Sequence, residues 1–244
     1  MAKIFGLIGK NIGYSFSRKY FSEKFNQEKL PFQYDNFDIP NIDNVPQLLT
    51  IKNISGFNVT IPYKEAIIPY LDQIDPIAKA IGAVNVVKIT KEGKTRGYNS
   101  DHYGFLNSLT PHLHPGNTLS AIILGTGGAS KAVKYALDTL TISYTVVSRN
   151  PSKNQLSYND IDEETLQRHK LLINTTPLGT SPNIQAAPNL PYAHLTANHI
   201  LYDLIYNPER TTFLKHGIQK GATVINGKKM LILQAEKSWE IWNS

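Results

Sequence analysis

The chain alternates between short apolar runs and longer stretches that carry one apolar face. In the first hundred residues, the runs predict strands at residues 3–9, 32–39, 54–60, 84–89 and 94–98. The turn Lys91-Glu92-Gly93 separates the last two runs, and this spacing is typical of a β-hairpin.

Two helices are expected between these strands. Ser17 can cap the first, which reaches about residue 30 and places Phe21 and Phe25 on one face. Pro62 suits the first turn of the second, which reaches residue 71. The alternation of strands and helices predicts an α/β domain in this half.

The second half opens with a helix at Asp101 and then follows a different pattern. Its short runs of Val, Ile and Leu lie at residues 119–124, 144–148, 171–175, 199–205 and 222–225. The connections are long enough for crossover helices, so we predict a Rossmann-type, doubly wound parallel sheet.

We therefore expect a two-lobe α/β protein. Residues 1–101 form the first domain and residues 102–228 the sheet domain. The last segment, 228–242, is amphipathic, with Leu231, Leu233, Ala235 and Trp239 available for burial. We expect this C-terminal helix, residues 229–244, to pack back on the first domain.

Composition narrows the class of protein. With 244 residues, 41% hydrophobic and 18% charged, the chain can form a packed core. The absence of cysteine excludes disulfides, thiolate metal sites and thiol catalysis. No apolar run approaches the roughly 20 residues that span a bilayer, and the first residues do not resemble a signal peptide. Cytoplasm is the expected location.

The formal net charge of +6 favours an anionic partner. Lysines and arginines are scattered, and no basic stripe is present, so nucleic acid is not expected; a small anionic ligand, or no particular partner, explains the charge as well. The histidines show no zinc-binding motif, and no metal is expected.

A glycine-rich turn is the first candidate site. Residues 125–130, Gly-Thr-Gly-Gly-Ala-Ser, follow a predicted strand and precede a helical stretch. Glycines in this context let the backbone approach a pyrophosphate at the start of a helix, so the turn predicts a dinucleotide.

The end of the next strand indicates which dinucleotide. An NAD site usually carries Asp or Glu there, to bond the ribose 2′-hydroxyl. Residues 148–153 contain no carboxylate and offer Arg149 and Lys153, which suit the 2′-phosphate of NADP. Exposed basic residues after a strand are the alternative interpretation.

Candidates for chemistry lie in the first half. Lys64 closes the segment 58–64 one turn into the second predicted helix, where the dipole disfavours a cation unless an anion is near. With Asp101 it could form a proton-transfer pair, although Asp101 also suits a helix cap. Ser15 and Ser17, at a helix start, could hold a carboxylate or only cap the helix.

These pieces occur in the order found in one family, so the chain resembles the shikimate dehydrogenases over nearly its whole length. The matching pieces are Ser15, Ser17, 58–64, 82–85, 99–101, 125–130, 173–177, 202–208, 226–227 and 230–234. The resemblance implies a reversible, NADPH-dependent reduction of 3-dehydroshikimate to shikimate in the biosynthesis of chorismate and the aromatic amino acids. It also makes the first domain the substrate domain.

The same resemblance implies roles for individual residues. Lys64 and Asp101 become the catalytic pair. The residues expected to bind substrate are Ser15, Ser17, Thr60, Lys64, Asn85, Asp101, Tyr206 and Gln234. The residues expected to bind NADP are Gly125, Gly127, Gly128, Ala129, Ser148, Arg149, Lys153, Thr175 and Gly227.

The chain departs from the family pattern at a few positions. Tyr14 stands where histidine is common, and Arg18 follows Ser17 where proline is common. Lys228 and Lys229 replace a small and apolar pair beside Gly227. The alternatives are an NAD-dependent quinate/shikimate dehydrogenase and a non-catalytic nucleotide-binding sensor on the same fold. Either a monomer or a homodimer is compatible with the sequence.

Overall fold

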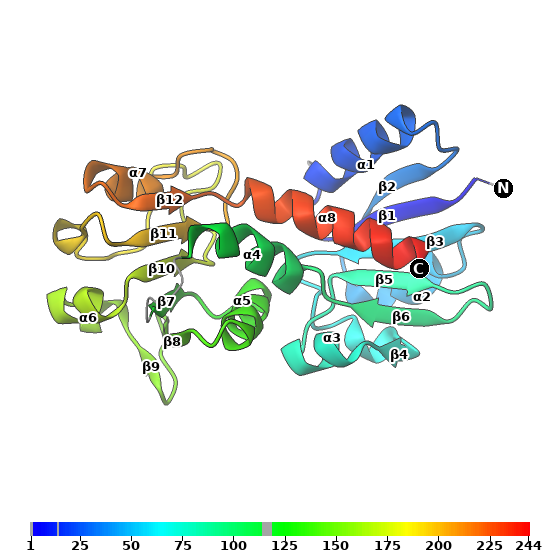
Figure 1. The fold of residues 1–244 in the computed structure, drawn as a ribbon. Coiled ribbons are helices and arrows are strands. Elements are labelled where there is room, and N and C mark those ends of the chain that lie inside the picture. Colours follow the sequence, from blue (N-terminus) through cyan, green and yellow to red (C-terminus); the bar gives the residue numbers. More distant parts are fainter. Residues whose placement is uncertain (1, 14, 114–118) are drawn as a thin grey trace. The chain divides into compact units, whose positions relative to one another are not determined.

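The computed structural model of the protein describes residues 2–13, 15–113 and 119–244. The chain divides into two compact units (Figure 1). Unit 1 contains residues 1–100 and 234–244, and unit 2 contains residues 101–233. Tyr14, one of the departures from the family pattern, lies outside the described residues.

Unit 1 is built on one mixed sheet of six strands. The strands are β1 (Ile4–Gly9), β2 (Gln33–Asp38), β3 (Ile54–Val59), β4 (Gln73–Ile74), β5 (Val86–Ile89) and β6 (Thr95–Tyr98), in the order β2-β1-β3-β5-β6-β4. The first three strands are parallel, and β5 and β6 form the predicted antiparallel hairpin. Gly93 takes φ 79° in its turn, a conformation that glycine adopts without strain.

Helices cover both faces of this sheet. One face carries α1 (Phe16–Gln27) and the C-terminal part of α8 (Lys228–Asn243), with Phe21, Phe25 and Trp242 packed against Phe5. The other carries α2 (Val45–Leu48) and α3 (Pro76–Ile81). Alternate strand residues therefore enter two separate cores.

The helix expected over residues 62–71 is wrong. The segment forms turns and a short 3₁₀ helix, Ile68–Tyr70, before β4. Pro69 lies inside the expected helix, where it lacks an N–H and disfavours helical geometry in the residue before it. Lys64 therefore does not lie in the first turn of a helix, and the argument that a helix dipole disfavours its charge does not apply.

Unit 2 contains a second sheet of six strands, all parallel. The strands are β7 (Ser120–Leu124), β8 (Ser143–Val147), β9 (Gln155–Leu156), β10 (Leu171–Asn174), β11 (Ile200–Asp203) and β12 (Thr223–Ile225), in the order β12-β11-β10-β7-β8-β9. The order reverses between β7 and β10, as in a doubly wound dinucleotide-binding fold.

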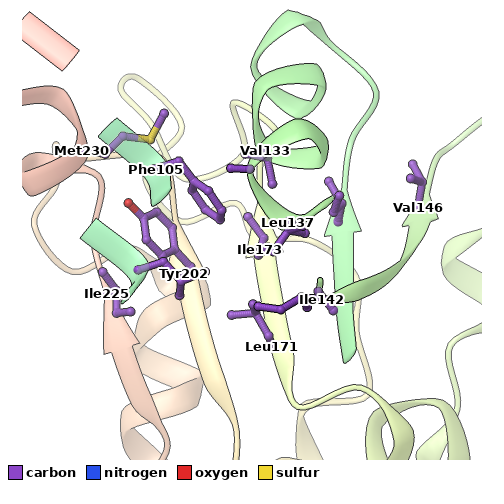
Figure 2. Packing of buried hydrophobic residues seen from close by; sticks show 14 residues of the cluster. Phe105, Val133, Leu137, Ile142, Val146, Leu171, Ile173, Tyr202, Ile225 and Met230 are labelled. Atoms are coloured by element: carbon purple, nitrogen blue, oxygen red, sulfur yellow. The ribbon is translucent and has the colours of Figure 1, made fainter. Parts of the chain in front are cut away.

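Its helices lie on both faces of that sheet. Figure 2 shows the face on which Phe105 of α4 (Asp101–Leu109) and Val133 of α5 (Gly128–Thr139) pack with Ile173 and Tyr202. The opposite face packs against α6 (Glu163–Arg168) and α7 (Thr212–Gln219). The predicted α/β fold class is confirmed. Among the described residues, no helix is long and apolar enough to cross a membrane.

Candidate functional site

Ser15 and Ser17 lie at the start of α1. Ser15, not Ser17, caps this helix: its hydroxyl accepts a hydrogen bond from the backbone N–H of Arg18 at 3.3 Å. The expected cap at Ser17 is wrong, because Ser17 already lies in the first turn. Ser17 is buried, close to the phenol of Tyr34 of β2. Arg18 itself is exposed.

The segment of unit 1 that carries Thr60 and Lys64 leaves the end of β3. Thr60 donates its N–H to the Ile8 carbonyl at 2.9 Å, which continues the pairing of β3 with β1. The Lys64 carbonyl accepts from the N–H of Val84 at 2.7 Å. This bond joins the segment to residues 82–85, so Lys64 and Asn85 come from neighbouring stretches of backbone.

Asn85 and Gln234 meet in a buried polar cluster with Ser100. The Ser100 N–H donates to Asn85 Oδ1 at 2.6 Å. Asn85 Nδ2 donates to Ser100 Oγ at 3.0 Å and reaches Gln234 Oε1 at 3.4 Å. All three residues are less than 9% exposed. Burying a polar group costs free energy unless the group is hydrogen bonded, and these three side chains bond to one another.

Asp101 follows Ser100 directly and is the first residue of α4. Its carboxyl is 6% exposed. Lys64 belongs to unit 1 and Asp101 to unit 2, and the pairing of the two in catalysis stays a prediction.

The glycine turn lies at the point where the strand order of unit 2 reverses. Gly125 takes φ 109°, and a Cβ there would come within 2.8 Å of Thr175 Oγ1. A Cβ at Gly127, which caps α5, would meet nothing within 4 Å. Because the two glycines carry no side chain, a ligand beside Thr175 can approach the backbone of the turn closely. The turn therefore fits a bound pyrophosphate. Gly128 and Ala129 open α5 beyond it.

Arg149 and Lys153 lie beyond the end of β8. Both side chains are exposed, and Ser148 before them is half-buried, with its N–H bonded to the Leu156 carbonyl. The structure thus presents two cations next to the glycine turn without a carboxylate at the strand end, which fits a 2′-phosphate.

Asp203 is a buried polar residue that sequence analysis did not single out. Its carboxylate accepts from Asn174 Nδ2 at 3.0 Å, from the Ile205 N–H at 3.0 Å and from Thr211 Oγ1 at 2.6 Å. Burial raises the pKa of the Asp203 carboxyl to about 6. The carboxylate ties the end of β10 to the loop that carries Tyr206.

Tyr206 and Gly227 lie near that anchor. Tyr206 is 36% exposed. Gly227 donates its N–H to the Ile205 carbonyl at 3.0 Å, and a Cβ there would lie 2.0 Å from the Leu204 carbonyl oxygen. Only glycine therefore fits at residue 227. Lys228 and Lys229 are exposed on the first turn of α8.

Sequence analysis also missed Ser238, which lies 3.2 Å from Ser100 Oγ of the polar cluster, and Tyr34, which donates to Asn58. Ser238 lies four residues after Gln234 on α8, so helical spacing could have indicated it. No local pattern marks Tyr34. Among residues 2–13, 15–113 and 119–244, no group of three or more His, Cys, Asp or Glu side chains could hold a metal ion.

A reversing parallel sheet with a glycine turn, together with a second α/β unit that holds a buried polar cluster, is typical of nucleotide-dependent oxidoreductases. Residues 7–87 match the shikimate dehydrogenase substrate binding domain. The NADP(+) shikimate dehydrogenase of Clostridium botulinum is 40% identical over 97% of this chain and 95% of its own length. The chain belongs to the shikimate dehydrogenase family.

Solved structures of shikimate dehydrogenases are similar to this chain over nearly its whole length. Shikimate dehydrogenase 1 from Peptoclostridium difficile is 37% identical, with a TM-score of 0.82 over 99% of this chain and 91% of its own. The Thermus thermophilus enzyme, in complex with NADP(H) and shikimate, is 30% identical, with a TM-score of 0.85 over 98% and 93%. The predicted family, enzyme class and NADP dependence are confirmed, and the relatives favour them over an NAD-dependent enzyme or a sensor.

Proposed function

We propose that this protein is an NADP-dependent shikimate dehydrogenase, which reduces 3-dehydroshikimate to shikimate and runs in reverse on shikimate. The observation that carries the proposal is the buried Asn85-Ser100-Gln234 cluster in unit 1, beside the segment that carries Thr60 and Lys64. Such directional donors and acceptors suit a small polyhydroxylated ring.

The residues of unit 1 would bind the ring. Ser15 and Ser17, at the start of α1, would donate to its carboxylate. Thr60, Asn85 and Gln234 would hold the ring hydroxyls, together with Lys64 and Asp101. Tyr206, on the loop anchored by Asp203, would add a contact from unit 2.

The residues of unit 2 would bind the cofactor. The backbone of residues 125–129 would cradle the pyrophosphate, with Thr175 and Gly227 beside it. Arg149 and Lys153 would neutralise the 2′-phosphate, next to Ser148. NADPH supplies the hydride for the carbonyl carbon when it is bound.

Lys64 would donate a proton to the carbonyl oxygen as negative charge develops there. Asp101 would orient the Lys64 ammonium and a neighbouring ring hydroxyl. General acid catalysis of this kind is worth roughly 10²–10⁴-fold in rate. The reverse reaction uses the same two residues, with Lys64 as the base.

The direct test is a spectrophotometric assay of shikimate and quinate, each with NADP and with NAD. We expect the highest kcat/KM for shikimate with NADP. Faster turnover of quinate with NAD would contradict the proposal and favour the quinate alternative. We further propose a cytoplasmic location and a monomer or homodimer; the mass of the purified protein by light scattering tests the oligomeric state.

A further inference from the structure

We infer that Tyr34 and Ser238 are positioning residues for the substrate, because they hold one continuous chain of buried hydrogen bonds through Asn58 and Ser100. The chain joins Tyr34 at one end to Asn85 and Gln234 at the other, and all of its members belong to unit 1. The inference rests on the proposed function, which places Ser17, Asn85 and Gln234 against the substrate.

The direction of the bonds is set at Asn58. Its Nδ2 donates to the Asn85 carbonyl at 3.3 Å and to Ser238 Oγ at 2.9 Å. A carbonyl oxygen only accepts, so this end of the amide must be the nitrogen. Asn58 Oδ1 therefore accepts, and the Tyr34 hydroxyl donates to it at 2.8 Å.

A second fixed point lies at Asn85. A backbone N–H only donates, so the 2.6 Å bond from Ser100 identifies the Asn85 oxygen. Asn85 Nδ2 consequently faces Ser100 Oγ and the side chain of Gln234, which must present Oε1. The nitrogen end of the Gln234 amide then faces away from this cluster.

Ser238 joins the two fixed points. Its hydroxyl donates to the Gln234 carbonyl at 2.8 Å, accepts from Asn58 and lies 3.2 Å from Ser100 Oγ. The side chain has no exposure to solvent. Because Ser238 bonds both to Asn58 of β3 and to the turn of α8 that carries Gln234, it fixes where Gln234 lies relative to Asn85.

Tyr34 closes the other end. Its ring is 3% exposed and stacks on Phe21 of α1, with centroids 4.8 Å apart and planes 14° apart. Burial raises the pKa of the phenol far above its ordinary value, so the group keeps its proton. With that proton committed to Asn58, Tyr34 fixes the orientation of the Asn58 amide, which in turn holds Ser238 and the backbone of Asn85.

Two variants with matched controls test the inference. Tyr34→Phe and Ser238→Ala each remove one hydroxyl from the chain of bonds. Tyr202→Phe and Ser108→Ala remove a buried pair in unit 2, where Ser108 Oγ lies 2.6 Å from the Tyr202 hydroxyl and donates to the Gly104 carbonyl at 2.7 Å. Each control therefore loses a bond of the same kind, away from the substrate residues.

We expect Tyr34→Phe and Ser238→Ala to raise KM for shikimate ~10-fold, because a disrupted buried hydrogen bond leaves its partner unsatisfied. KM for NADP should stay within about twofold of the wild-type value. The two substitutions weaken binding of the substrate ring, in the ground state and the transition state alike, and do not touch the cofactor residues. Ser238→Thr, which keeps the hydroxyl, should recover most of the affinity. Both controls should keep the wild-type KM for shikimate while lowering Tm.

The outcomes separate the inference from the proposed function. Wild-type activity on shikimate, with an unchanged KM in both variants, would overturn the positioning role alone. A wild-type protein that does not oxidise shikimate would overturn both. Tyr34→Phe keeps the stacked ring, so it provides the test even where Ser238→Ala does not fold. Equal rises in KM in the variants and in their controls would reduce Tyr34 and Ser238 to a structural role.

Discussion

The residues assigned to ligands in the two units differ in burial and in hydrogen bonding. In unit 1 the polar side chains assigned to the substrate are buried and bonded to one another: Asn85, Ser100 and Gln234 are 3%, 0% and 8% exposed. In unit 2 the groups assigned to the cofactor are bare backbone at residues 125–128 and the exposed cations Arg149 and Lys153.

These two arrangements suit two different ways of selecting a ligand. A ring of fixed stereochemistry is best distinguished by donors and acceptors whose directions are locked, and a low dielectric makes an error in pairing costly. A phosphate is recognised mainly by charge and by backbone N–H groups, so flexible, hydrated cations suffice. The substrate half is therefore expected to be sensitive to single atoms and the cofactor half to charge.

The largest expected effect concerns Lys64, whose side chain would act mainly in the transition state. Lys64→Ala should lower kcat about 10³-fold, which corresponds to roughly 4 kcal/mol. Shikimate and NADP should still bind within about tenfold, because the other contacts remain. Steady-state kinetics and calorimetric binding measure both quantities.

Lys79→Ala, on the exposed face of α3, is the control and should behave as wild type. Asp101→Asn should also fall steeply, and the double variant should be little worse than the worse single variant. A Lys64→Ala protein that keeps more than about a tenth of the wild-type kcat would eliminate Lys64 as the acid.

The next prediction concerns Asp203, a buried carboxyl of unit 2. Its pKa rises from 3.8 to about 6 on folding, so between these values the folded protein binds more protons than the unfolded chain. The free energy of unfolding therefore falls as the pH rises through this window, by about 3 kcal/mol for a shift of about two pKa units.

Asp203→Asn does not titrate, so its free energy of unfolding relative to wild type should increase from about pH 4 to pH 6. Urea unfolding across this range measures it. Asp162→Asn should show the opposite sign, but below pH 3.8, because hydrogen bonds from Thr165 lower the pKa of Asp162. A flat difference for Asp203→Asn would mean that the buried carboxyl ionises as it does in the unfolded chain.

Arg149 tests the claim that the cofactor half depends on charge. Arg149→Ala should weaken NADP binding ~10-fold or more and leave NAD binding nearly unchanged, since one charge-assisted contact to the 2′-phosphate is lost. The preference should also weaken with added salt. Arg168→Ala, an exposed arginine on α6, is the control, and equal losses for NADP and NAD would refute the role of Arg149.

The smallest effect is expected at Ser15. Ser15→Ala should raise KM for shikimate several-fold, and it should also cost ~1 kcal/mol of stability because Ser15 caps α1. Asp162→Ala removes the cap of α6 and should change stability without changing KM. A rise in KM for NADP larger than that for shikimate would return Ser15 to a capping role; Ser17→Ala should follow the same ratio.

Local sequence predicted much of both halves because their signals are short-range. The Val- and Ile-rich runs gave all five long strands of unit 2, and the hairpin at Lys91–Gly93 followed from spacing and one glycine. The glycine turn and the basic strand end of the cofactor half are also contiguous in sequence. Pro69 carried the signal against a helix over residues 62–71, but the expectation rested on Pro62 in the first turn and did not weigh it.

The substrate half depended on contacts that no local window contains. Tyr34 and Ser238 are 204 positions apart, yet both bond to Asn58. The resemblance to a family named Asn85 and Gln234, but it could not say that Gln234 presents its oxygen to Asn85. Asp203 likewise occurs within a matching segment, and only its partners Asn174 and Thr211 give it a role.

The sequence by itself determined the two α/β halves, the glycine turn, the arginine rather than a carboxylate at residue 149, and the family. These properties follow from backbone permissiveness, periodicity and charge, which each residue carries with it. Only the tertiary structure decided which way the buried amides face and which hydroxyls donate. A hydrogen-bond direction depends on the nearest carbonyl or N–H, and folding brings that partner from a distant strand or helix.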